Sequence, residues 1–212
     1  ANFYQIGPET FRTRNLSKML TTFLTGKAFD FLRTKHQLAY SVWFLFSSIE
    51  KIMGFTVQVK SQEEKHHFSK VYEKMSEFID VIGRKFVREM THEEFESIRK
   101  ARIQNLKSPD KSIYEEFSRN IVEIENEFYK FNFDELHAKN AETLIIEDLK
   151  EFYNFVFNKE NMRKLSIQVI GNQTNEKIIK RDILNEKWPI DENLIIDSSE
   201  FRNNLHLYSA IN

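Results

Sequence analysis

The residues best suited to chemistry lie in the stretch FDFLRTKHQLAY, residues 29–40. Arg33 and Tyr40 stand on either side of a change in pattern, because apolar residues at helical spacing give way there to the buried-type run AYSVWFLF. Arginine stays charged at any working pH and carries a fixed fork of donors, and tyrosine carries a hydroxyl donor on a rigid ring. Such a pair can bind carbonyl oxygens and stabilise an oxyanion.

The residues alone also allow a purely structural interpretation of this pair. Arg33 can cap the end of its helix or pair with a nearby carboxylate such as Asp30, and Tyr40 can be no more than the first residue of a strand. Both interpretations stay open at this level.

Other patterns that carry chemistry are missing. The five glycines never cluster, so no phosphate-binding loop is expected, and the absence of cysteine excludes disulfides, thiolate zinc sites and a cysteine nucleophile. The segment KHHF, residues 65–68, is interpreted as surface polar residues at a helix start. None of the six histidines belongs to an H-E-x-x-H or H-x-x-E-H zinc motif: His36, His66, His67, His92, His137 and His206. The sequence therefore predicts no metal or cofactor site in this chain.

Composition limits the class of protein. A length of 212 residues favours one domain, residues 1–212, with one core. The formal net charge of −1 argues against a nucleic-acid partner, and no apolar run approaches the ~20 residues of a membrane span. The lack of cysteine is compatible with the cytoplasm. Because the chain begins with Ala1 and runs at once into a strand-like segment, we expect it to be a piece of a longer polypeptide.

The elements that must position Arg33 and Tyr40 follow from hydrophobic periodicity. Residues 2–6 form a predicted strand, and a helix is expected from Leu16 that Gly26 ends or bends, followed by a short helix over residues 29–33. Residues 39–48 and 51–60 are two strands with so short a link that they must pair antiparallel.

Capping-box pairs mark the helices of the middle region. Ser61 with Glu64, Thr91 with Glu94, and Ser112 with Glu115 predict helix starts near 62, 92 and 113. Apolar residues at helical spacing are expected to be buried: Val71, Met75, Phe78, Ile79, Ile82 and Phe86 in the first helix, Phe95, Ile98 and Ile103 in the second, Phe117, Ile121, Ile124 and Phe128 in the third. A helix over residues 147–157, a strand over 164–171 and a short helix in the segment 174–189 that stops before Pro189 complete the pattern. The predicted class is an α+β fold, an antiparallel sheet with helices packed on one face.

Three features of the sequence resemble one family. The stretch FDFLRTKHQLAYSV is similar to the signature of C-terminal-type domains of the insulinase (pitrilysin-type) zinc peptidases, in which a leucine–arginine pair precedes leucine, a small residue and a tyrosine that enters a strand. The order strand, helix, hairpin, helical stretch, strand resembles that family's repeated domain. The tail SEFRNNLHLYSAIN resembles the end of insulin-degrading-type enzymes. The implied fold is the metallopeptidase LuxS/MPP-like type.

The resemblance implies a role. In the family, four related domains form two bowl-shaped halves that close around a peptide, and this chain resembles the fourth. Zinc is then expected in the complete enzyme, bound by a preceding domain in the N-terminal catalytic half of the same polypeptide, with none in this chain, which is inactive alone. Matching the motif position by position makes Arg33 and Tyr40 the residues that hold the peptide substrate's carbonyls and stabilise the oxyanion opposite the metal.

Ala39 stands where the insulinase branch has glycine, and His36 where it often has an acid, so fine substrate positioning can differ.

Two alternatives remain. Relatives of the same fold serve as non-catalytic structural or partner subunits, as in processing peptidases and respiratory complexes, although the EFR triplet at 200–202 resembles the single-chain insulinase branch. A stand-alone peptide-binding module that uses an exposed sheet edge is the other.

Overall fold

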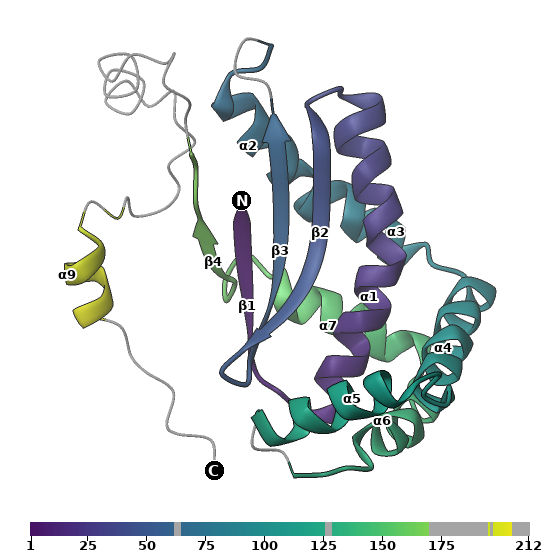
Figure 1. Ribbon diagram of the computed structural model, residues 1–212. Helices are drawn as coiled ribbons and strands as arrows, with labels where there is room; N and C mark the ends of the chain where they lie inside the picture. Colours follow the sequence, from purple (N-terminus) through teal and green to yellow (C-terminus); the bar gives the residue numbers. More distant parts are fainter. Residues whose placement is uncertain (62–64, 126–128, 170–194, 196, 205–212) are drawn as a thin grey trace.

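An antiparallel sheet of four strands in the order β2-β3-β1-β4 organises the fold (Figure 1). The computed structural model describes residues 1–61, 65–125, 129–169, 195 and 197–204. Its elements in chain order are β1 (Asn2–Pro8), α1 (Phe11–Phe29), η1 (Asp30–Lys35), β2 (Ala39–Ile49), β3 (Ile52–Ser61), α2 (Phe68–Glu77), η2 (Phe78–Gly83), α3 (Arg84–Arg88), α4 (His92–Lys107), α5 (Ile113–Glu125), α6 (Phe133–Glu142), α7 (Ile146–Val156), β4 (Arg163–Ser166) and α9 (Ser198–Asn203).

The β2–β3 hairpin confirms the predicted pairing of residues 39–48 with 51–60. Phe44 lies opposite Val57 in the ladder, and Glu50 and Lys51 make the turn with left-handed φ angles of 50° and 61°. A two-residue turn with both φ angles positive matches the twist of an antiparallel pair.

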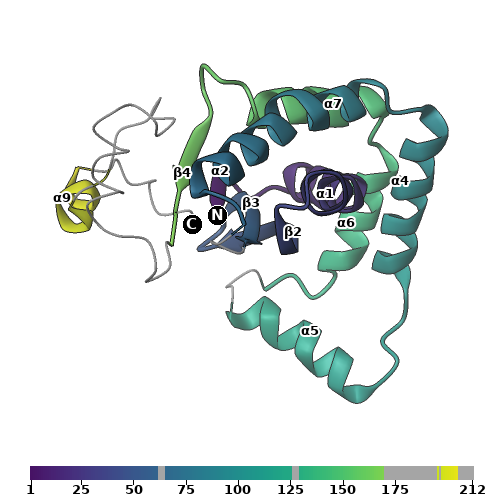
Figure 2. The ribbon, with the colours of Figure 1, turned by 90° about the horizontal axis from the view of Figure 1, so that it is seen from above.

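The core lies between one face of the sheet and the helices. Figure 2 shows α1 and α7 on the same side of the sheet. The buried side chains that fill this layer include Tyr4, Phe44 and Phe55 from the strands and Leu20, Leu24, Phe152 and Phe157 from the helices and their ends. The opposite face leaves Trp43 and Leu45 exposed. The predicted α+β class is therefore confirmed.

The first helix differs from its prediction at both ends. It begins at Phe11, because Thr10 and Thr13 form a capping box five residues before the periodic apolar run. Gly26 lies inside α1 and neither ends nor breaks it: its carbonyl accepts a hydrogen bond from the Asp30 N–H. The chain continues without interruption into the π-helix η1, so the separate short helix expected over residues 29–33 is wrong.

The capping predictions had mixed outcomes. Thr91 and Glu94 form the expected box at the start of α4. Ser61 instead ends strand β3, and α2 begins later, at Phe68, with His67 as its cap, so the start near 62 is wrong. The helices near 113 and 147 are confirmed. The strand expected over 164–171 is present only in its first part, because β4 ends at Ser166 and residues 167–169 do not continue it. The helix expected over 174–189 and most of the tail lie outside the described residues.

Helix α5 has the opposite orientation from the one predicted. Phe117 is 61% exposed and Ile113 and Ile124 are exposed as well, whereas Glu123 on the other side is only 4% exposed. In Figure 2, α5 stands apart from α2 and α7, on the opposite side of the molecule. The prediction that Phe117 and Ile124 belong to the core is therefore wrong, since no described element covers them, whereas Phe128 lies outside the described residues.

Candidate functional site

Arg33 is presented by the end of the long first helical segment. It is half-buried in η1, next to the fully buried Leu32. Gln37 closes the segment with a left-handed φ of 51°, and the Leu38 N–H donates to the Leu32 carbonyl at 3.1 Å. This turn provides partners for carbonyls at the helix end and leads the chain directly into β2. The arginine is thus held at a fixed point beside the start of the strand.

Tyr40 is placed by a β-bulge at the start of β2. Ala39 pairs with Ser61 while Ser41 pairs with Lys60, so Tyr40 is the extra residue on its strand. A bulge redirects a side chain relative to the regular alternation of the strand. The Tyr40 side chain is 76% exposed as a result.

The two side chains are stacked on one another. The Arg33 guanidinium carbon lies 5.0 Å from the centroid of the Tyr40 ring and 4.7 Å from that of Phe29. A cation–π contact of this kind holds the guanidinium over the ring faces by electrostatic attraction. Neither Arg33 nor Tyr40 forms a side-chain hydrogen bond or ion pair with any described residue, and the pairing with Asp30 that a structural role could use is not formed. Both donors therefore remain available.

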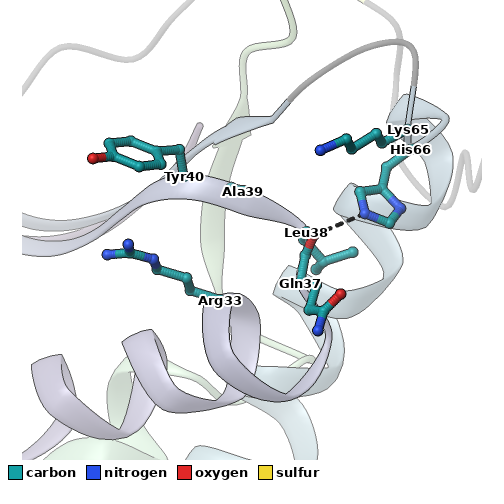
Figure 3. Close-up of a pocket in the computed structure, with 7 residues that line it drawn as sticks. All are labelled: Arg33, Gln37, Leu38, Ala39, Tyr40, Lys65 and His66. Carbon is teal, nitrogen blue, oxygen red and sulfur yellow. Dashed lines mark hydrogen bonds between the residues drawn. The ribbon is translucent and has the colours of Figure 1, made fainter.

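Arg33 and Tyr40 line a pocket of about 240 Å³, which we call the Arg33–Tyr40 pocket. Figure 3 shows the two side chains lying side by side, with Lys65 pointing into the same space. The Nε2–H of His66 donates to the Gln37 carbonyl at 2.8 Å, which ties the segment before α2 to the turn after η1 (Figure 3). Three of the lining residues are of basic types and none is an acid. The complete lining is Arg33, Gln37, Leu38, Ala39, Tyr40, Lys65 and His66.

The sequence pattern missed the contribution of Lys65 and His66. They were interpreted as surface residues of a helix start, but α2 begins only at Phe68 and leaves them in the pocket wall. The local signal that could have placed them is weak, because the contact to Gln37 spans 29 positions in sequence.

The two departures from the family signature have different surroundings. Ala39 lines the pocket, so its methyl group takes space that a glycine would leave open. His36 does not line it: its ring packs edge-on against Phe31, with the centroids 4.6 Å apart. Burial is the main cause that lowers the pKa of His36, and Lys74 lowers it further.

The described residues offer no metal-binding cluster. Across the ranges that the structure covers, no three His, Asp or Glu side chains are placed to hold an ion. Zinc therefore does not fit the described part of this chain, and the chemistry of its own residues is that of hydrogen-bond donors. In the same ranges no helix is both long and apolar enough to cross a membrane.

Comparisons with known proteins agree with this fold. Residues 19–121 match the family model described as PQQ synthase PqqF-like, C-terminal lobe domain 4. The chain is 28% identical to human nardilysin over 169 residues, covering 80% of this chain and 14% of nardilysin. It is 28% identical to the insulin-degrading enzyme of Drosophila melanogaster over 178 residues, covering 82% and 17% of the two. The crystal structure of pitrilysin superimposes on 82% of this chain and 19% of that one, with a TM-score of 0.62 and 19% identity.

The sheet with its helix layer is the fold seen in pitrilysin, and the described residues of this chain hold no metal-binding cluster. The matches make the chain similar to the C-terminal-type domains of the insulinase-like, pitrilysin-type zinc metallopeptidases. It spans 14–17% of the length of the two curated relatives named.

Proposed function

We propose that this chain is the C-terminal domain of an insulinase-like zinc metalloendopeptidase, where it closes the peptide chamber and contacts the substrate through Arg33 and Tyr40. The observation that carries the proposal is the stacked Arg33–Tyr40 pair, oriented by ring contacts while its donors are free. A structural arginine uses its donors within the fold, whereas a substrate-binding arginine must keep them for the ligand.

Each residue of the pair has a distinct role in the proposal. The Arg33 guanidinium donates to carbonyl oxygens of the bound peptide backbone. The Tyr40 hydroxyl donates to the carbonyl oxygen that gains negative charge as the peptide bond is attacked. Donors that are oriented in advance stabilise such an oxyanion more than the starting carbonyl, because they need no reorganisation during the reaction.

The proposed partner is the N-terminal catalytic half of the same polypeptide, which binds the zinc. The apolar side of α5 is exposed and includes Ile113, Phe117 and Ile124. This exposure supports the proposal that another domain packs on α5. A solvent-exposed helix normally turns its charged side outward, so the reversed orientation is expected where another domain packs. The absence of cysteine fits the cytoplasm, which we propose as the location.

A peptide titration of the isolated ¹⁵N-labelled chain tests the proposal. A short unstructured peptide should shift the NMR signals of Arg33 Nε–H and of the Ala39 and Tyr40 amides in a saturable way. Arg33→Gln should abolish these shifts, while Arg88→Gln, on an exposed arginine of α3, should leave them unchanged. Metal analysis of the dialysed chain should find no stoichiometric zinc, and no peptide cleavage is expected.

The main alternative is a structural subunit of the same fold. Absence of any peptide-induced shift at Arg33 and Tyr40 would favour it. One tightly held zinc per chain would contradict the proposed division of labour between the two halves.

A further inference from the structure

A second cavity, of about 340 Å³, lies between α1, the edge strand β2 and α4. It shares no lining residue with the Arg33–Tyr40 pocket. We call it the Lys18–Arg102 cavity, and it is lined by Lys18, Met19, Thr21, Thr22, Leu45, Phe46, Ile98, Ala101, Arg102 and Asn105. The proposed function makes no use of it.

The Arg102 guanidinium is held in place by a hydrogen bond to a buried side-chain amide. Its Nε donates to Asn15 Oδ1 at 3.1 Å, and Asn15 is fully buried. The Asn15 amide nitrogen in turn donates to the His137 carbonyl at 2.8 Å and to Asn140 Oδ1 at 3.0 Å. The two terminal nitrogens of Arg102 donate to no described residue. Arg102 is therefore held through its Nε–H, and the N–H groups of its two terminal nitrogens remain available to a ligand.

The positive charge of the cavity is not neutralised by a described acid. Lys18 lies 5.2 Å from the centroid of the Phe46 ring and forms no ion pair within the described ranges. Glu9 is the acid that attracts Lys18, but its two carboxylate oxygens are already bound by Arg14 and Ser48. Asp134 attracts Arg102 through space but forms no ion pair with it. Lys18 and Arg102 thus line one cavity, and neither is bonded to a described acid.

The electrostatics agree with this geometry. Burial is the main cause that lowers the pKa of Arg102, and Arg14 adds to it by repulsion. Burial also lowers the pKa of Lys18, with repulsion from Arg14 and Arg102. An anion between Lys18 and Arg102 would relieve this repulsion, since an opposite charge nearby favours the charged form of each group.

The rest of the lining is apolar and sets the character of the ligand. Met19, Leu45, Phe46, Ile98 and Ala101 form a hydrocarbon wall beside the two cations. The Asn105 amide, which bonds to no described residue, adds a neutral donor at the same cavity. Pockets of this size with an apolar lining and a few converging polar groups suit small organic ligands.

We propose that the Lys18–Arg102 cavity binds a carboxylate carried on an apolar body. The free fork of Arg102 matches the two oxygens of a carboxylate, and Lys18 adds a point charge. The apolar body lies against Leu45, Phe46 and Ile98. Two sources carry this chemistry, a fatty acid and the carboxyl end of a peptide with an aliphatic last residue.

Calorimetric titration of the 212-residue chain tests the proposal, with sodium octanoate below its micellar range and N-acetyl-leucine as probes. Saturable binding of either supports the site, and the tighter of the two identifies the source. Arg102→Gln and Lys18→Gln should each weaken binding at least about tenfold, because hydrogen bonds to charged groups are the strong ones. Lys100→Gln, on the exposed surface of α4, is the matched control and should leave affinity unchanged.

A second variant separates charge from space. Ala101→Phe fills the cavity from an exposed position and keeps both cations, so it should abolish binding while the melting temperature stays near that of the parent chain. The Ala101→Phe variant also tests the proposed site if Arg102→Gln fails to fold. Inorganic phosphate should bind much more weakly than octanoate. Binding of neither carboxylate, equal binding of phosphate, or full affinity in Ala101→Phe would overturn the proposal.

Discussion

The Arg33 guanidinium carbon lies 5.0 Å from the centroid of the Tyr40 ring, although the two residues belong to different elements, a π-helix and the bulged start of a strand. The contact couples the positions of the two donors, so a change in either ring or guanidinium displaces the other. Arg33 and Tyr40 are best regarded as one unit.

Substitutions of this pair should impair catalysis more than folding. Under the proposed function, Arg33→Ala or Tyr40→Phe in a full-length enzyme should lower kcat/KM. The decrease should not exceed the effect of losing one oxyanion donor, about 2.7–4 kcal/mol. Arg33→Lys should restore little activity, because an ammonium lacks the planar fork that stacks on the rings. Kinetics and melting temperature are measured on the same variants. A structural pair would show the reverse, a lower melting temperature with turnover per folded molecule retained, and unchanged kcat/KM in both variants would leave the pair without a catalytic role.

The parts of this fold that could be predicted from the sequence depend on local signals. A buried-type apolar run located β2, alternating apolar residues located β3, and the Thr91–Glu94 pair located α4. These signals involve only near neighbours in sequence. The proposed role of Arg33 and Tyr40 was inferred from a resemblance to a family signature, because the residue types alone left a purely structural interpretation open.

The parts that the sequence did not reveal depend on distant contacts. The apolar spacing of α5 is typical of a helix with a buried face. Among the described residues no element covers that face, because periodicity does not encode which element packs on a helix. Helix α6 was not singled out by the sequence pattern. The bulge at Tyr40 and the contact of His66 with Gln37 also depend on which strand and turn lie opposite, which spacing does not encode.

The reversed orientation of α5 predicts an unusual stability pattern. Phe117→Ser should cost less than about 1 kcal/mol of unfolding free energy in the isolated chain, because the side chain is 61% exposed. Phe95→Ala is the matched control, and its removal from a buried site should cost about 3–5 kcal/mol. Urea denaturation measures both. A large loss in Phe117→Ser would show that α5 packs inward in solution.

The two helical glycines Gly26 and Gly83 should respond oppositely to alanine. A Cβ at Gly26 in α1 meets no atom within 4 Å, so Gly26→Ala should stabilise the chain by about 1 kcal/mol through helix propensity. A Cβ at Gly83 would lie 2.8 Å from the Tyr153 hydroxyl oxygen and 3.0 Å from the Phe78 carbonyl oxygen. That hydroxyl donates to the Ile79 carbonyl at 2.5 Å and cannot move without breaking the bond.

Gly83→Ala should therefore destabilise the chain by about 1–3 kcal/mol, as overpacking does in a filled core. Thermal denaturation of the two variants side by side gives the comparison. A melting temperature that rises in both would mean that Tyr153 moves aside without cost.

His137 should make the stability of the chain pH-dependent. Its side chain is 1% exposed and packs edge-on against the rings of Phe11 and Phe133. Burial lowers the pKa of His137 to about 3, and repulsion from Arg102 and Arg14 contributes. The folded chain thus takes up this proton only far below the ordinary histidine pKa of 6.5.

The sign follows from proton linkage. Above the unfolded pKa His137 is neutral in both states, and as the pH falls below about 6.5 only the unfolded chain gains the proton, so the unfolding free energy should fall by up to about 1.4 kcal/mol per pH unit. His137→Phe keeps the ring contacts and removes this proton, so urea denaturation between pH 7.5 and 5 should show a smaller slope. Some slope should remain, since burial also lowers the pKa of His36. An equal slope in His137→Phe and in the parent would mean that His137 is protonated in the folded chain at these pH values.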